Sequence, residues 1–198
     1  PLEAKKMIGY LPEQPPLYLD MTVDEYLNFV YELKKCELNR KKHIAEICEV
    51  VKIKDVRKRV IRNLSKGYRQ RVGIAQALIG NPEVIIFDEP TVGLDPKQII
   101  EVRNLIRMLG KSHTVILSTH ILPEVQAVCD RIVVINKGKI IADKKTEDIT
   151  QAVNENRRFT VKICGPQREV LSFLRSKNGI LYAEVGTDRD GDAYSYHI

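Results

Sequence analysis

Polar residues that can cap a helix divide the first part of the chain into amphipathic stretches. Thr22, Asn39 and Ser65 each precede a segment whose apolar residues recur at helical spacing. These patterns predict three helices, the third of which ends near the Asn-Pro pair at residues 81–82. The proline-rich segment 13–20 is expected to be a loop.

The pattern then changes to short runs of consecutive apolar residues. Residues 84–87 and 113–118 form two such runs, and residues 7–11 form a similar segment near the start. Continuous apolar runs are typical of strands buried on both faces, as in a parallel sheet. Helices are expected to begin at Asp95 and near Pro123, because proline is tolerated in a first helical turn. Strands that alternate with helices predict an α/β fold with a mostly parallel sheet flanked by helices.

The chain is expected to contain two parts joined by a linker. Residues 1–150 form the α/β domain, and about residues 20–80 within it form a helical subdomain. The polar segment 151–158 indicates the linker. Residues 159–198 follow a β-α-β-β pattern, which predicts a small, incomplete accessory module without a chemical motif. The remaining predicted elements are strands at 131–135, 139–142, 159–164, 180–186 and 193–198 and a helix at 167–177.

Composition narrows the class of protein only modestly. The 198 residues carry a net charge of +6, which fits either a solvated basic surface or an anionic partner. Basic clusters are short and interleaved with acids, so no nucleic-acid partner is expected. The four cysteines form no CxxC pair and the histidines are scattered, which indicates reduced, buried thiols and no metal-ligand spacing among the cysteines and histidines.

Targeting signals are absent from the sequence as given. No signal peptide is recognisable, and no apolar run is long enough to cross a bilayer. The first residue is Pro1 rather than methionine, so we expect the sequence to be cut from within a longer protein.

Two carboxylates end the first apolar run. Asp88 and Glu89 follow residues 84–87 directly, at the edge of the sheet where α/β proteins bind their ligands. Asp88 could hold Mg²⁺, because this ion prefers few protein oxygens together with phosphate oxygens. Glu89 could orient or deprotonate a water that attacks a phosphate. The alternative is a strand that ends in two solvated acids.

Three other positions carry candidate chemistry. Residues 64–68 read Leu-Ser-Lys-Gly-Tyr, and a Ser and a Gly at a helix start form an anion site, although Ser65 could be a plain N-cap. His120 follows the second apolar run and could reach a phosphate, although a lone loop histidine is commoner. Asp95 could act across a subunit interface or simply cap a helix.

The order and spacing of these motifs resemble those of the ABC ATPase family over residues 8–149. In that resemblance Ser65, Lys66, Gly67 and Tyr68 belong to the signature motif, and residues 84–89 are similar to the Walker B strand with Glu89 as the catalytic glutamate. The segment 93–95 resembles the D-loop and His120 the switch histidine. The family has a P-loop NTPase-like fold and uses ATP and Mg²⁺, so both are the expected cofactors.

The sequence departs from the family pattern at several positions. Glu13 stands where the Q-loop glutamine is usual, with Gln14 one place later, and Glu13 could still bind Mg²⁺. Lys66 and Tyr68 differ from the commonest signature and resemble the branch that powers two-component exporters. The phosphate loop GxxxxGK[ST] is absent, since the Gly-Lys-Ser at 110–112 follows a helix rather than a strand. These 198 residues alone are therefore predicted to be inactive.

The resemblance implies an ATP-binding and ATP-hydrolysing subunit of a transporter. Its partners would be a second ATPase subunit, in a homodimer or heterodimer, and an integral membrane permease. The protein would lie in the cytoplasm, peripheral on the inner face of the membrane. Two alternatives remain: a soluble ABC ATPase that acts on ribosomes or DNA, and a regulatory binding module that has lost catalysis.

Overall fold

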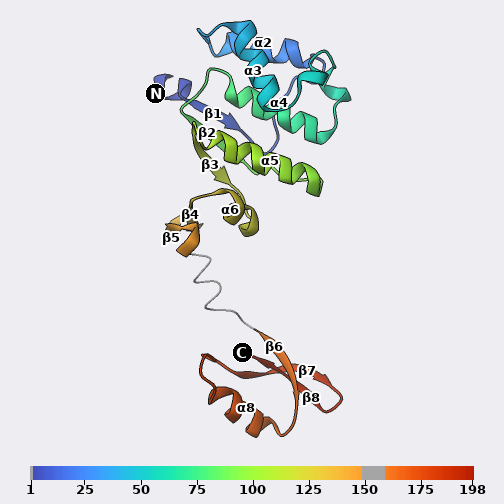
Figure 1. Ribbon diagram of the computed structural model, residues 1–198, viewed down its shortest axis with the longest axis vertical. Helices are drawn as coiled ribbons and strands as arrows, with labels where there is room; N and C mark the ends of the chain where they lie inside the picture. The colour runs from blue at the N-terminus through green and yellow to red at the C-terminus, as the bar shows by residue number, and fades with distance from the viewer. Residues whose placement is uncertain (1, 149–158) are drawn as a thin grey trace. The chain divides into compact units, whose positions relative to one another are not determined.

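The computed structural model describes residues 2–148 and 159–198 (Figure 1). The chain divides into two compact units, residues 1–146 and 147–198. The expected domain end at residue 150 and the expected linker 151–158 lie outside the described residues. Within the described ranges, no helix has both the length and the apolar character needed to cross a membrane.

A parallel sheet forms the centre of the first unit. Its strands are β1 (Ile8–Leu11), β2 (Val84–Asp88) and β3 (Thr114–Ser118), in the order β1-β2-β3. Because all three run in parallel, their carboxyl ends meet at one edge of the sheet. The predicted α/β fold with a parallel sheet is confirmed.

Helices precede and follow these strands as the sequence pattern predicts. Thr22 begins the first predicted helix with a capping box, in which its hydroxyl accepts from the Glu25 amide and the Glu25 carboxylate accepts from the Thr22 amide. Asn39, Ser65 and Asp95 cap their helices in the same side-chain manner. A short first helix was not predicted. The helices are α1 (Leu2–Lys6), α2 (Val23–Leu33), α3 (Arg40–Val50), α4 (Lys66–Leu78), α5 (Pro96–Leu109) and α6 (Leu122–Val128), with 3₁₀ turns η1 (Lys54–Val56) and η2 (Ile61–Asn63).

The two faces of the sheet differ in burial. Leu11, Ile85 and Phe87 are fully buried in one core with apolar residues of α4 and α5, which lie on that face (Figure 1). On the opposite face, Tyr10 remains 48% exposed and Ile116 51% exposed. The described residues therefore leave this apolar face largely open.

Gly9 brings β1 into close contact with the last turn of α4. A Cβ atom at Gly9 would lie 2.2 Å from the carbonyl oxygen of Ala77 and 3.0 Å from Cγ of Pro82. The nearest atom belongs to the backbone, which cannot move aside as a flexible side chain would. Only glycine permits this approach.

We expect Gly9→Ala to lower the free energy of unfolding by about 1–3 kcal/mol, the usual cost of overpacking a core. Gly110→Ala is the matched control. Gly110 has φ −60° and no atom closer than 3.5 Å to an added Cβ, so its substitution should be neutral or slightly stabilising. Urea unfolding of the two variants checks this. Equal stability would mean that α4 can move away from β1 without a loss of free energy of unfolding.

A hairpin completes the first unit. Strands β4 (Arg131–Asn136) and β5 (Lys139–Lys145) are antiparallel and are joined by Lys137 and Gly138, both with positive φ. Such a pair of left-handed residues is the preferred two-residue hairpin turn. Arg131 adds a two-armed ion pair to Asp143 at 2.6 and 2.8 Å. The predicted strands and their turn are confirmed.

The second unit is a small sheet with one helix. It contains β6 (Thr160–Cys164), α8 (Gln167–Arg175), β7 (Glu184–Asp190) and β8 (Ala193–His197), and its antiparallel sheet has the order β6-β8-β7. Leu174, Ala183 and Tyr196 form its core.

Two details of the second unit differ from the sequence analysis. The strand predicted at 180–186 is placed too early, because the Ala183 carbonyl accepts hydrogen bonds from the Arg175 guanidinium instead of from a neighbouring strand. Of the four thiols that were expected to be buried, Cys164 is exposed and Cys36 and Cys129 are half-buried.

Candidate functional site

The carboxyl ends of β2 and β3 form the candidate site. Asp88 is the last residue of β2 and pairs with Ser118 of β3. Glu89 comes next, and its amide donates to the Ser118 carbonyl at 2.9 Å. Its φ of 45° lies in the left-handed region, which costs a non-glycine residue about 1–3 kcal/mol and is found most often at functional sites. The Glu89 side chain, which follows this left-handed backbone, is hydrogen-bonded to the loop after β3.

Both oxygens of the Glu89 carboxylate are held by that loop. Oε1 lies 2.6 Å from Nδ1 of His120 and accepts from the His120 amide at 3.0 Å. Oε2 accepts from the hydroxyl of Thr119 at 3.1 Å. The imidazole itself is 73% exposed, whereas the carboxylate side chain is only 16% exposed. The pair therefore presents a fixed carboxylate beside an accessible ring.

The two groups shift each other's pKa in opposite directions. Burial works to raise the pKa of Glu89, but the hydrogen bonds from His120 and Thr119 outweigh it, so the net pKa lies below the usual 4.5. The hydrogen bond to Glu89, and then its charge, raise the pKa of His120 above 6.5. Near neutral pH, the carboxylate is thus ionised and the ring holds its proton more firmly than a free histidine.

The His120 ring should therefore lose its proton at a higher pH than a free histidine does. A raised histidine pKa stabilises the folded chain fully below about 6.5, and this contribution is lost as the pH rises through the folded pKa above 6.5. Because the pKa of Glu89 is lowered, the pair also weakens in acid, below 4.5. NMR titration of the His120 ring should show a midpoint above 6.5 that falls in Glu89→Gln. The exposed Glu83→Gln serves as control, and a midpoint unchanged in Glu89→Gln would contradict the coupling.

Asp88 and Glu13 differ as candidate metal ligands. The Asp88 carboxylate is half-buried, and within the described ranges it takes part in no hydrogen bond or ion pair, so its oxygens are available to a hard cation. Glu13 is exposed in the loop after β1, and its charge adds to the raised pKa of His120, so it lies on the same side. No group of three metal-binding side chains occurs among the residues described. Mg²⁺ would fit here only with phosphate and water oxygens as further ligands.

The predicted signature residues lie at the start of α4. The hydroxyl of Ser65 accepts from the Tyr68 amide at 3.4 Å, and the first turn of α4 contains no acidic residue. The Tyr68 hydroxyl donates to Asp55 at 3.0 Å, which ties the helix start to η1. The amino end of α4 therefore keeps its positive potential.

The same helix start packs on the first turn of α5 and on the segment that precedes it. A Cβ atom at Gly67 would lie 2.5 Å from the carboxamide of Gln98, and the ammonium of Lys66 lies directly against Gly93. Asp95 caps α5 by accepting from the Gln98 amide at 2.9 Å. The structure thus brings residues 66–67 and 93–98 together.

The nine predicted site residues consequently fall into two groups. Asp88, Glu89, His120 and Glu13 lie at the sheet edge, and residues 65–68 lie near Asp95. In the parts of the chain that the structure describes, no hydrogen bond or ion pair connects residues 65–68 with Glu89 or His120.

One buried residue of this region escaped the sequence analysis. Glu124 of α6 is 3% exposed, and it accepts from the Thr91 hydroxyl at 2.5 Å and from Arg103 of α5 at 3.2 Å. It therefore joins α6, the helix after His120, both to α5 and to the segment that follows Glu89. Its partners come from separate parts of the sequence, so no local motif could have predicted its role.

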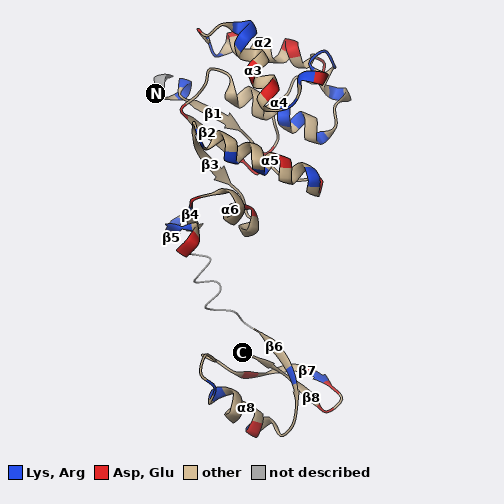
Figure 2. Ribbon diagram, in the orientation of Figure 1, with Lys and Arg blue, Asp and Glu red and all other residues tan. Residues whose placement is uncertain are grey.

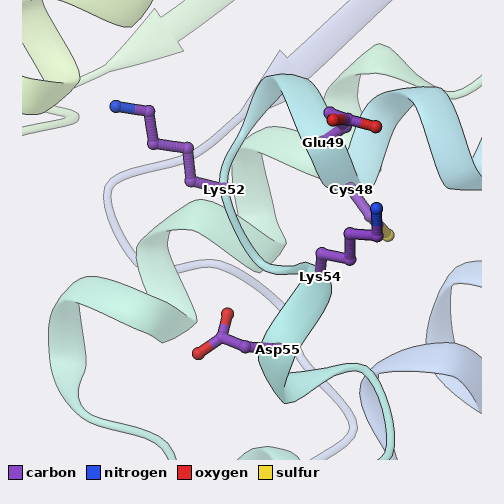
Figure 3. Close-up of a pocket in the computed structure, with 5 residues that line it drawn as sticks. All are labelled: Cys48, Glu49, Lys52, Lys54 and Asp55. Atoms are coloured by element: carbon purple, nitrogen blue, oxygen red, sulfur yellow. The ribbon is translucent and has the colours of Figure 1, made fainter.

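A pocket of 370 Å³ lies elsewhere, between α3 and η1. Its lining residues are Cys48, Glu49, Lys52, Lys54 and Asp55 (Figure 3). The charged ends of Glu49, Lys52 and Asp55 point in different directions rather than toward one centre. None of the sheet-edge residues lines it, so we assign it no part in the candidate site.

A parallel sheet whose carboxyl edge bears paired acids beside a histidine, together with a glycine-containing helix start, is the arrangement expected of a nucleotide-binding domain of the ABC type. A profile of the ABC transporter family matches residues 2–92. The chain is 37% identical over 196 residues to the bacitracin transport ATP-binding protein BcrA of Bacillus licheniformis, and 33% identical over 178 residues to the linearmycin resistance ATP-binding protein LnrL of Bacillus subtilis. The chain belongs to the family of ABC transporter ATP-binding proteins.

The extent of these matches matters for what they support. The BcrA match covers 98% of this chain, both units included, but only 62% of BcrA; the LnrL match covers 88% of this chain and 57% of LnrL. The chain thus spans little more than half the length of these relatives. A solved structure of CbiO1 from Clostridium perfringens, described as part of the ABC transporter complex cbiONQ, is similar with a TM-score of 0.66 and 26% identity, over 77% of this chain and 64% of that one.

Proposed function

We propose that the full-length protein is the ATP-binding and ATP-hydrolysing subunit of an ABC transporter, and that a separate membrane subunit moves the substrate. The observation that carries the proposal is the Glu89 carboxylate, held by His120 and Thr119 at the end of the central strand β2. An ionised carboxylate in a fixed position is the group that orients and deprotonates an attacking water.

Each residue at the sheet edge has a distinct role in this proposal. Glu89 accepts the proton of the attacking water, and its lowered pKa keeps it ionised for that purpose. The exposed ring of His120 meets the terminal phosphate and, through its bond to Glu89, keeps the carboxylate in place. Asp88, with Glu13 as a second candidate, would hold Mg²⁺, which neutralises phosphate charge when bound.

A second subunit would complete the site. The start of α4 offers the Ser65 hydroxyl, unoccupied helix N–H groups and the exposed Lys66 to a phosphate. Since residues 65–68 are not bonded to Glu89 within one chain, we infer that they act on the nucleotide of a sister subunit, in a homodimer or heterodimer. Asp95 would lie at the same interface, close to residues 66–67.

The membrane partner is inferred from the relatives and from one exposed surface. BcrA and LnrL are named for bacitracin transport and linearmycin resistance, which favours an exporter branch. In the loop after β1, Tyr18 is 53% exposed and Leu19 44% exposed, which suits contact with a permease. The protein would therefore be held at the inner face of the membrane. Among the helices of the first unit, α2 carries only acidic residues, α4 only basic ones, and α3 and α5 both (Figure 2). Because both signs are mixed over this unit, nucleic acid is not expected as a partner.

Two measurements on the full-length protein test this proposal. It should hydrolyse ATP in the presence of Mg²⁺, and it should co-purify with a multi-span membrane protein encoded beside it. The 198 residues alone should show no turnover, because they contain no phosphate loop. Stable association with ribosomes or DNA instead of a membrane protein would favour a non-transport ABC ATPase, and robust hydrolysis by the 198 residues would contradict the proposed division of the site.

A further inference from the structure

The two edges of the second sheet are protected to different degrees. Strand β7 carries a bulge between Val185 and Arg189, and the charged residues Asp188, Arg189 and Asp190 follow one another along it. Bulges and charges are the usual means by which an exposed strand avoids pairing with another chain. The β7 edge is therefore closed to further strands.

Strand β6 has no such protection. It pairs with β8 over five consecutive positions, from Thr160 opposite His197 to Cys164 opposite Ala193, without a shift in register. Phe159 extends the pairing, because it exchanges both backbone hydrogen bonds with Ile198 at 2.7 and 2.8 Å. The β6 edge (residues 159–164) is thus regular and lacks proline and bulges (Figure 1).

The single charge on the β6 edge is directed away from it. Lys162 donates to Asp190 at 2.8 Å, and Asp190 belongs to β7 on the far side of β8. The ammonium therefore reaches across β8 toward the opposite edge of the sheet. Because Asp190 partly neutralises this ammonium, a single Lys162 is only a weak deterrent to a strand that approaches from the open side.

Backbone geometry fixes which groups are free on the β6 edge. Because Phe159 bonds to Ile198, alternation directs the backbone groups of residues 159, 161 and 163 toward β8. The N–H and C=O groups of Thr160, Lys162 and Cys164 consequently face the open side. Phe159, Val161 and Ile163 share the apolar face that packs on α8, and Phe159 remains 53% exposed there.

We propose that β6 pairs antiparallel with β6 of a second copy of this chain, about a two-fold axis at Val161, so that the two small sheets become one. In this register Phe159 lies opposite Ile163 of the second copy, and the apolar rows continue across the junction. Thr160 lies opposite Lys162 of the second copy, and each such pair exchanges both free backbone hydrogen bonds. An axis at Lys162 would instead place two lysines directly opposite each other, which is unfavourable.

This interface goes beyond the proposed ATPase function and does not require nucleotide. The self-association of the 198-residue chain should therefore be measured by sedimentation without ATP or Mg²⁺, which separates it from a nucleotide-held dimer. We expect a concentration-dependent dimer. Thr160→Lys places like charges opposite each other twice and should raise the dimer Kd about tenfold, whereas Thr160→Glu should lower it by pairing with Lys162. Both variants lose the Thr160–His197 contact, so each is the control of the other.

Cross-linking tests the register independently. In a Cys164→Ser background, Val161→Cys should form a disulfide dimer on mild oxidation, because directly opposite residues bring their Cα atoms within disulfide range. Phe159→Cys, which faces Ile163 of the second copy, should not. Circular dichroism confirms folding of each variant. Three results would each overturn the proposal. The first is a chain that stays monomeric at all concentrations, and the second is a dimer whose Kd does not depend on the sign of the charge at position 160. The third is amide protection of Thr160 and Lys162 in a monomer, which would mean that another segment of the chain pairs with this edge.

Discussion

Glutamine at position 89 should reduce ATP turnover by the full-length protein by about two to four orders of magnitude while leaving nucleotide binding largely intact. Loss of a general base costs about 10²–10⁴-fold in rate. The Glu89→Gln amide keeps the size of the side chain, its oxygen can still accept from the His120 amide, and its NH₂ group can donate to the Thr119 hydroxyl, so the loop should keep its position. Steady-state turnover and nucleotide affinity, measured side by side, check the expected split.

The control for this experiment lies at the other end of the same strand. Glu83 precedes β2 and is exposed, so Glu83→Gln changes the same charge without touching the site and should leave turnover unchanged. Undiminished turnover in Glu89→Gln would remove Glu89 from the chemistry. A parallel loss of nucleotide affinity would mean that the substitution disturbs the fold of the site rather than the proton transfer.

Removing the buried carboxylate of Glu124 should produce the largest loss of stability. Its side chain is 4% exposed and its partner Arg103 is 26% exposed, so Glu124→Ala leaves a partly buried guanidinium without its counter-charge. Breaking a buried ion pair from one side costs about 3–5 kcal/mol. Because the Arg103 side chain retains some access to water, we expect about 3 kcal/mol. Urea unfolding followed by amide exchange in α5 and α6 measures the first unit apart from the second.

Two comparison variants define the cause. Glu124→Gln can still accept from Thr91 and should recover part of the loss. Glu46→Ala removes an exposed glutamate from α3 and should change stability by less than about 0.5 kcal/mol. If Glu124→Ala were as stable as Glu46→Ala, the Thr91–Glu124–Arg103 contacts would contribute nothing to the first unit.

Local sequence signals were sufficient for most elements of the fold. Thr22, Asn39, Ser65 and Asp95 each cap the predicted helix because capping depends on residues only two or three positions apart. The continuous apolar run at 84–87 likewise lies in a central strand. The strand expected at 180–186 was wrong at its start, since Arg175 of the preceding helix, rather than a local pattern, takes the Ala183 carbonyl.

Interactions within the site could be predicted only in part. The order of Asp88, Glu89 and His120 indicated one sheet edge, but the double hold on the Glu89 carboxylate depends on the pairing of Asp88 with Ser118 and on the left-handed turn at Glu89. These are tertiary and backbone features with no local signature. Glu124 shows the same limit, because its value to the site arises from partners that are distant in the sequence.

The contact at Gly9 determines how α4 can move. Since the last turn of α4 is in close contact with β1, a rotation of this helix would pivot near Ala77. The displacement would be largest at the opposite end, where Ser65 lies. Eleven or twelve residues of helix separate the two ends, or roughly 17 Å. A tilt of about 10° there displaces the Ser65 hydroxyl by roughly 3 Å, about the length of one hydrogen bond. A small angular change at the sheet is thus enough to make or break a contact with a bound phosphate.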